Sequence, residues 1–184
     1  MVKYVIMRKD LSASKRPVNM IYWSLFVIIG VILDFGTKSL AENLLLYGEP
    51  IPVVPGLLNW TLAYNPGAAF SFLADQEGWQ RWFFIGITIV ISVVLFFWIK
   101  RTERVERLLR FGLACVLIGA IGNLIDRVVL GHVIDFIHVT YNGRSFPIFN
   151  VADIFVTSGV GFIILSSFTE KKRKLSQVTD DKQA

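Results

Sequence analysis

The sequence predicts an α-helical integral membrane protein with four transmembrane helices and a small sheet outside the bilayer. Two properties of its 184 residues point to this class: 54% are hydrophobic, and the mean hydropathy is +0.56. Both values are higher than is typical of a soluble domain. In addition, most of the 19 Lys and Arg residues flank long apolar runs, as they do in loops that border a membrane. A chain of this length forms one domain, 1–184.

The first apolar run spans 20–33 and follows a basic segment, 1–19, which we interpret as a tail without a fold of its own. The run has the composition of a signal-peptide core, but D-F-G-T-K follows it instead of a small-residue cleavage site. We therefore predict a retained first transmembrane helix that ends at Asp34.

Residues 41–81 have the mixed composition of a connection outside the membrane. We expect a short interfacial helix over 41–47, a turn-rich stretch over 51–56 and a strand over 58–64, where aromatic and β-branched residues favour extended backbone. The N-P-G sequence at 65–67 predicts a turn. Together these segments predict a small sheet that lies on the bilayer.

The next two apolar runs predict the second and third transmembrane helices. Residues 82–99 contain no charge and are long enough to cross a bilayer, and a short charged turn separates them from the third run, 108–125. The third run contains Gly112, Gly119 and Gly122, which allow close contact between helices.

The fourth transmembrane helix is predicted over 154–169, with 150–153 adding a turn at its start. Residues 126–149 form a second outer connection. The core of the domain is therefore 20–170, and we expect 171–184 to be a polar, disordered tail.

The basic residues also predict the orientation of the chain. The N-terminal tail, the turn at 100–110 and the C-terminal tail hold five Lys or Arg residues each, which is 15 of the 19. Positive residues favour the cytoplasmic side, so we predict that both termini are cytoplasmic and that 34–81 and 126–153 face outward. This distribution also explains the net charge of +5 without a nucleic-acid partner.

The outer ends of the helices gather acidic and amide side chains, and each has a purely structural interpretation. Asp34 and Lys38 are spaced for an ion pair on one helix. Asp126 lies at a helix end, Asp153 complements a helix dipole, and Asp135 fits a loop cap.

Taken together, these residues favour a catalytic role, because placing ionisable groups at membrane depth costs free energy and usually serves a function. Asp135 and Asp153 each have apolar neighbours, and two close carboxylates cannot both ionise cheaply. Such a pair can share a proton, so that one member activates water and the other polarises a carbonyl group. This predicts peptide hydrolysis, although the residue pattern alone leaves open whether Asp126 or Asp135 is the second acid.

Other sites are less compatible with the sequence. His132 and His138 do not pair with Cys or Glu at metal-ligand spacing, and no G-x-S-x-G motif marks a nucleophilic serine. Cys115 lies in an apolar run and is interpreted as a small packing residue. We therefore expect neither a metal nor a cofactor.

Five motifs in order resemble those of the lipoprotein signal peptidase (signal peptidase II) family, an intramembrane aspartyl peptidase family. They are D-F-G-T-K at 34–38, N-P-G-A-A-F-S at 65–71, G-N-L-I-D-R at 122–127, V-I-D-F-I at 133–137 and F-N-V-A-D at 149–153. The resemblance covers about 20–170. It implies an aspartic endopeptidase of the bacterial inner membrane with four spans and a periplasmic β-cradle. Its substrates would be prolipoproteins, cut before a cysteine that carries diacylglycerol.

The resemblance also implies roles for individual residues. Asp135 and Asp153 match the catalytic pair. Residues that line or brace the site are Asn65, Asn123, Arg127 and Asn150, and those that support it are Asp34, Lys38, Gly119 and Asp126. We expect a monomer whose partners are prolipoproteins and membrane lipids. The basic segment 1–19 is longer than the family needs.

Two other classes of function remain open from the residue pattern. One is a transporter or channel whose aspartates relay ions, which the absence of an internal repeat disfavours. The other is a membrane scaffold without enzymatic activity. Cleavage of a lipidated prolipoprotein by the purified protein distinguishes all three.

Overall fold

The computed structural model describes residues 20–67, 79–103 and 106–183, and side chains up to Thr169. The predicted basic tail 1–19 and the A-A-F-S part of the N-P-G-A-A-F-S motif lie outside the described residues.

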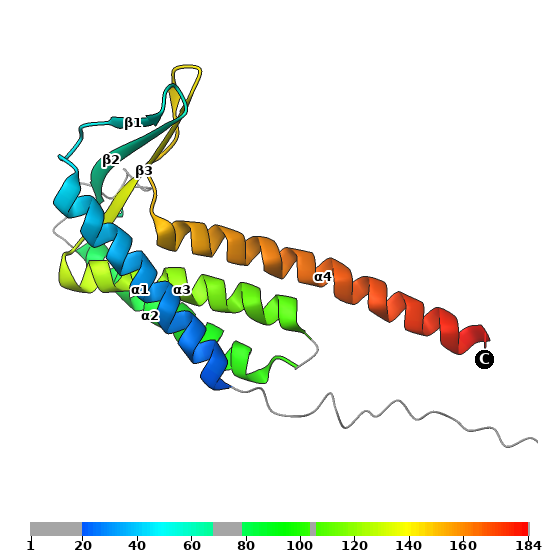
Figure 1. Cartoon of the computed structure of the whole chain (residues 1–184). Helices are drawn as coiled ribbons and strands as arrows, with labels where there is room; N and C mark the ends of the chain where they lie inside the picture. Colours follow the sequence, from blue (N-terminus) through cyan, green and yellow to red (C-terminus); the bar gives the residue numbers. More distant parts are fainter. Residues whose placement is uncertain (1–19, 68–78, 104–105, 184) are drawn as a thin grey trace, which may run out of the picture.

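Four helices in the described residues are long and apolar enough to cross a membrane, which confirms the predicted number and order of the spans. They are α1 (Met20–Leu44), α2 (Trp79–Arg101), α3 (Arg107–Val129) and α4 (Val151–Gln183). In α3, 50% of the most apolar stretch is buried inside the protein, against 11–17% in the other three. The third span is therefore the central helix, and α1, α2 and α4 all pack against it (Figure 1).

Two predictions about helix ends were wrong. The first span does not end at Asp34 with a separate interfacial helix over 41–47, because α1 continues without a break to Leu44. Asp34 and Lys38 lie buried in this helix and neutralise each other, so the charged residues do not terminate it. The C-terminal tail was predicted to be disordered, but its backbone continues α4 as a helix to Gln183, well beyond the other helices (Figure 1).

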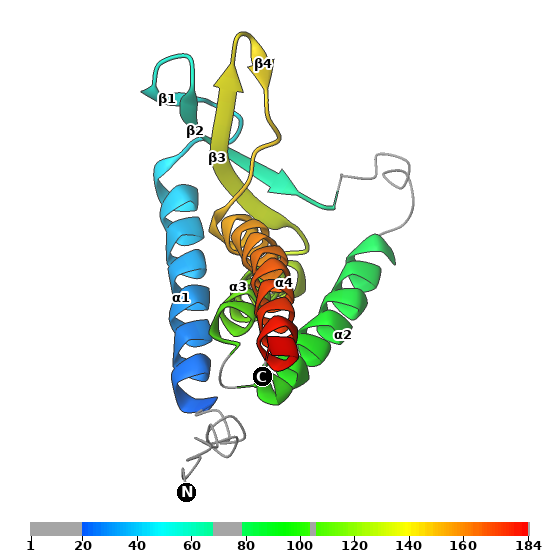
Figure 2. The ribbon, with the colours of Figure 1, turned by 90° about the vertical axis from the view of Figure 1, so that its right-hand side faces the viewer.

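A four-stranded antiparallel sheet caps one end of the helices (Figure 2). Its strands lie in the order β1 (Ile51–Val54), β2 (Leu58–Asn65), β3 (Val133–Tyr141) and β4 (Arg144–Ser145). The predicted strand at 58–64 is confirmed as β2. Residues 51–54 form a strand instead of the predicted turn, and Pro52 is tolerated there because β1 is an edge strand.

Strand β3 places side chains on both faces of the sheet within the protein. Ile134 and Phe136 pack with Ala41 and Leu62 in one apolar cluster. Because neighbouring side chains of a strand point to opposite faces, Asp135 points away from this cluster and toward the start of α4. The structural interpretation of Asp135 as a loop cap is therefore wrong, because the second outer connection contains the strand that carries this carboxylate.

Small residues bring α3 and α4 into backbone contact, as predicted for the glycines of the third span. A Cβ atom on Gly112 would lie 2.7 Å from the carbonyl oxygen of Gly159, and one on Gly159 would lie 2.6 Å from that of Gly112. A Cβ atom on Gly119 would overlap the carbonyl oxygen of Ala152. The close approach at Gly119 sets the next turn of α3, with Asn123, beside the first turn of α4.

Candidate active site

Asn150, immediately before α4, connects the two aspartates that the sequence analysis singled out. Its amide nitrogen donates to Oδ1 of Asp135 at 2.7 Å and to the carbonyl oxygen of Ile134 at 3.1 Å. Its Oδ1 accepts the backbone N–H of Asp153 at 3.0 Å, while Oδ2 of Asp153 accepts the backbone N–H of Asn150 at 3.2 Å. This reciprocal pair is a capping box, so the bonds that start α4 also fix Asp153 relative to Asp135.

Each carboxylate receives a second amide donor from a different element. Asn65, the last residue of β2, donates to Oδ2 of Asp135 at 3.1 Å, and its own Oδ1 accepts the backbone N–H of Gly67 at 2.9 Å. Asn123 of α3 donates to Oδ1 of Asp153 at 2.9 Å. Three amide side chains thus hold two carboxylates, and the structure brings together all five residues predicted for this part of the site.

The two carboxylates differ in their surroundings. Asp135 is 3% exposed, whereas Asp153 is only half-buried. Burial raises the pKa of Asp135 from 3.8 to about 6, and the nearby negative charge of Asp153 adds to this shift against the lowering effect of the hydrogen bonds from Asn65 and Asn150. Asp153 lies in the first turn of α4, where the helix dipole favours a negative charge. The surroundings of Asp135 therefore favour its protonated form.

A buried ion cluster lies beside the pair. The ammonium group of Lys38 lies 2.7 Å from Oδ2 of Asp34 and 2.8 Å from Oδ2 of Asp126, and the lysine is 1% exposed. Asp34 also accepts the backbone N–H of Ala152 at 2.8 Å, and Asp126 accepts that of Ile134 at 3.2 Å. A buried ion pair tolerates its desolvation only with such additional bonds. The cluster therefore ties α1 and α3 to the start of α4 and to β3.

The position of Asp126 bears on whether Asp126 or Asp135 is the partner of Asp153, which the residue pattern left open. The carboxylate of Asp126 faces Lys38 and the backbone of β3, whereas Asn150 reaches Asp135 and Asp153 together. The geometry thus pairs Asp153 with Asp135.

Arg127 lies at the same end of α3. Its Nη1 donates to the carbonyl oxygen of Asn123 at 3.2 Å, and its guanidinium group lies 5.4 Å from the ring centre of Phe84. It also interacts electrostatically with Asp153 and Asp135. Within the described ranges, the buried Nε of Arg127 has no hydrogen-bond partner.

Sequence reasoning missed the contribution of α2 to the site. Arg81 donates to the carbonyl oxygens of Arg127 at 2.8 Å and Val128 at 2.7 Å, and so stabilises the C-terminal end of α3. Phe84 supports Arg127 from the same helix. The available signal was that Arg81 is one of only four basic residues in the predicted outer connections.

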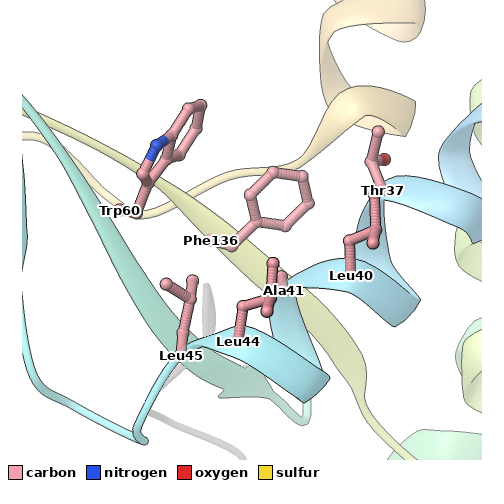
Figure 3. A pocket seen from close by; sticks show the side chains of 7 residues that line it. All are labelled: Thr37, Leu40, Ala41, Leu44, Leu45, Trp60 and Phe136. Atoms are coloured by element: carbon pink, nitrogen blue, oxygen red, sulfur yellow. The ribbon is translucent and has the colours of Figure 1, made fainter.

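Two cavities lie near these residues. One has a volume of about 380 Å³ and reaches Asp153; the residues that line it are Phe146, Pro147, Phe149, Asp153, Ile154, Thr157 and Ser158. The other, of about 230 Å³, is an apolar groove between the end of α1 and the sheet, and Leu44, Trp60 and Phe136 are among the residues that line it (Figure 3). Phe136 points to the opposite face of β3 from Asp135, so of these two cavities only the first reaches a carboxylate of the pair, that of Asp153. In the part of the chain that the structure describes, no three His, Cys, Asp or Glu side chains are grouped to hold a metal ion.

The comparisons with known proteins agree with the fold and with the motifs. The family model described as signal peptidase (SPase) II matches residues 26–169. The lipoprotein signal peptidase of Ectopseudomonas mendocina is 54% identical over 151 residues, which cover 82% of this chain and 89% of the relative. That of Acinetobacter baylyi is 42% identical over 161 residues, covering 88% and 89%.

Solved structures give the same result. A bacterial membrane enzyme structure determined by the in meso method at 2.3 Å resolution has a TM-score of 0.74 at 34% identity, and the alignment covers 86% of this chain and 94% of that one. A second, at 1.9 Å resolution, has a TM-score of 0.73 at 35% identity. The chain is therefore a multi-pass membrane protein that belongs to the signal peptidase II family of peptidases.

Proposed function

We propose that this chain is an aspartic endopeptidase that removes the signal peptide from prolipoproteins by cutting before a cysteine that carries diacylglycerol. Family membership and the names of its relatives support the peptidase activity and the class of substrate. The observation that carries the aspartic mechanism is the bridge by Asn150, which holds Asp135 and Asp153 in one hydrogen-bonded unit.

In this mechanism Asp153 is the base and Asp135 is the acid. A water molecule adds its oxygen to the scissile carbonyl carbon as its proton passes to the carboxylate of Asp153, while Asp135 gives its proton to the carbonyl oxygen. The C–N bond of the resulting diol then breaks as the proton on Asp153 passes to the leaving nitrogen and a hydroxyl proton returns to Asp135. The products are a signal peptide with a free carboxyl group and a lipoprotein with a free amino group.

The cavity beside Asp153 suits the proposed substrate. Phe146, Phe149 and Ile154 make it largely apolar, as binding an apolar segment from the membrane requires. Arg127 of α3 is not among the residues that line this cavity, but its buried Nε has no hydrogen-bond partner among the described residues. We assign this donor to a backbone carbonyl of the substrate.

The proposal includes a location and an orientation. The chain would act as a monomer in the bacterial inner membrane, as the single domain 1–184, with both termini cytoplasmic. The sheet would be the β-cradle, and it would lie with the aspartate pair near the periplasmic face. The distribution of basic residues supports this orientation, because the last turn of α2 holds Lys100 and Arg101 and lies at the end of the helices opposite the sheet (Figure 2).

The test is cleavage of a purified prolipoprotein by the purified enzyme in liposomes. The substrate is supplied with and without diacylglycerol on its cysteine, and mass spectrometry identifies the new N-terminus. We expect cleavage of the modified form only, immediately before the cysteine, and none by Asp153→Asn. Equal cleavage of both forms would contradict the proposed specificity, and cleavage by Asp153→Asn would contradict the mechanism.

A further inference from the structure

We propose that Lys38 is a positioning residue for cleavage, because its ammonium group fixes the orientation of the Asn123 amide and thereby directs a hydrogen-bond donor onto Asp153. This inference rests on the proposed function, since it concerns how the base of the reaction is kept ionised. It gives the lysine a role beyond its ion pairs with two carboxylates.

The three protons of the Lys38 ammonium group match three acceptors. Two are the carboxylates of Asp34 and Asp126, and the third is Oδ1 of Asn123 at 3.0 Å. Ion pairing with the two carboxylates accounts for only the first two contacts. The third reaches the residue that contacts Asp153.

The contact decides which way the amide of Asn123 points. An ammonium group can only donate, so the oxygen of the amide must face Lys38. The amide of Asn150 reinforces this orientation by donating to the same oxygen at 3.2 Å. The nitrogen of Asn123 is consequently directed at Oδ1 of Asp153, 2.9 Å away. If the amide reversed, its NH₂ group would meet the ammonium group and its oxygen would meet a carboxylate.

Donors that bind a carboxylate favour its ionised form. Oδ1 of Asp153 accepts from Asn123, and Oδ2 accepts from the backbone of Asn150. Losing the Asn123 donor would therefore make Asp153 easier to protonate. The observable consequence is the acid limit of cleavage, at which the base becomes protonated.

The net charge of the groups around Asp153 must be kept constant for this test. Arg127 of α3 and Asp135 of β3 interact with the site electrostatically, and Lys38, Asp34 and Asp126 form the adjacent cluster. Arg81 of α2 is bonded to backbone oxygens at the end of α3.

The decisive variant is Lys38→Met/Asp34→Asn, which removes one positive and one negative charge and leaves the net charge unchanged. Its control is Asp34→Asn, which keeps the contact between Lys38 and Asn123. The readout is the pH profile of kcat/KM on the diacylglyceryl-modified prolipoprotein. We expect the acid limit of the double variant to rise by about one pH unit, the typical effect of losing one hydrogen bond to a charged group. In Asp34→Asn the limit should stay in place or fall, because a neighbouring negative charge is removed.

A rise of the acid limit in the double variant, without a rise in Asp34→Asn, supports the positioning role. An unchanged limit in the double variant, or an equal rise in both variants, overturns it. If the double variant does not fold, Asn123→Leu with Lys38 intact gives the second test: the acid limit must rise by a similar amount, and an unchanged limit rejects the inference. Failure of the wild-type enzyme to cleave at any pH would instead reject the proposed function.

Discussion

The side-chain amide of Asn150 lies 2.7 Å from Oδ1 of Asp135, and both residues are buried within the protein. Asn150 also starts helix α4, where its side chain accepts the backbone N–H of Asp153. One residue therefore combines a helix cap with the alignment of two carboxylates. A hydrogen-bond network, and not packing alone, therefore sets the distance between Asp135 of β3 and Asp153 of α4.

The first prediction concerns this bridge. Asn150→Ala removes the donor to Asp135 and the acceptor for Asp153, and we expect turnover per folded molecule to fall by about 100-fold or more, as when a preorganised donor is lost from an active site. Asn59→Ala is the matched control, because the Asn59 amide lies in the sheet and bonds to Thr140 at 3.4 Å. The control should keep most of its activity. Similar losses in both variants would show that Asn150 has no special part in the site.

A second prediction concerns the contact between α3 and α4. Gly159→Val would place a side chain against the carbonyl oxygen of Gly112, so it should lower the free energy of unfolding by about 1–3 kcal/mol or more. Gly161→Val, two residues along the same helix, has no atom within 4 Å of the new Cβ and serves as the control. Thermal unfolding in detergent measures both. A Gly159→Val melting temperature equal to that of the control would contradict the close helix contact.

The pKa of Asp135 predicts the pH dependence of activity. If Asp135 is the acid, kcat/KM should fall about tenfold per pH unit once the pH rises above its pKa of about 6. A rate profile of the reconstituted enzyme from pH 4 to pH 9 measures this limit. A profile that stays flat to pH 9 would show that Asp135 does not donate a proton from the free enzyme.

The same pKa shift predicts a change in stability. The folded-state pKa of Asp135 lies above its ordinary value of 3.8, so the folded protein binds the proton more tightly than the unfolded chain. This contribution to stability is fully present below pH 3.8 and is lost as the pH rises to about 6, by up to about 3 kcal/mol. Asp135→Asn should remove this part of the pH dependence. An identical pH dependence in wild type and variant would contradict the assigned shift.

The orientation can be tested with single cysteines. Cys115 is buried in α3, so Cys115→Ala should keep activity and give a cysteine-free background. Arg144→Cys on β4 should react with an impermeant thiol reagent in intact spheroplasts, whereas Arg101→Cys at the end of α2 should not. Both positions are exposed, so accessibility alone does not separate them. Labelling at position 101 alone would reverse the orientation.

The sequence predicted the four spans because each is an apolar run bordered by charges. It could not locate the end of α1, since a charged pair normally marks a membrane boundary. Lys38 is buried because Asp126, distant in the sequence, completes its ion cluster, and only the packed fold brings the two together. Strand β3 was missed for a similar reason: its apolar residues contact both the sheet and α1, so they show no simple alternation.

The candidate site, like the fold, could be predicted from the sequence only in part. Asp135 and Asp153 were predicted to be the catalytic pair from the resemblance of their motifs, and the residue pattern alone left Asp126 as an alternative to Asp135. The bonds of Asn150 and Lys38 place Asp135 and Asp126 in different surroundings, and such bonds have no signature in a single sequence. The contribution of Arg81 was missed because the backbone oxygens that it binds can be supplied by any residue type.

The central claim is that Asp135 and Asp153 act as one unit, and it is tested most directly by turnover per folded molecule on a diacylglyceryl-modified prolipoprotein. The variants are Asp135→Asn, Asp153→Asn, the double variant, and Asp126→Asn as the comparison. We expect both single variants to bind substrate without cleaving it, and the double variant to be no worse than either, as for residues that serve one step. Asp126→Asn should lose folded protein while the remaining molecules stay active. Substantial cleavage by Asp135→Asn or Asp153→Asn would contradict the account, as would a stable, substrate-binding Asp126→Asn without activity.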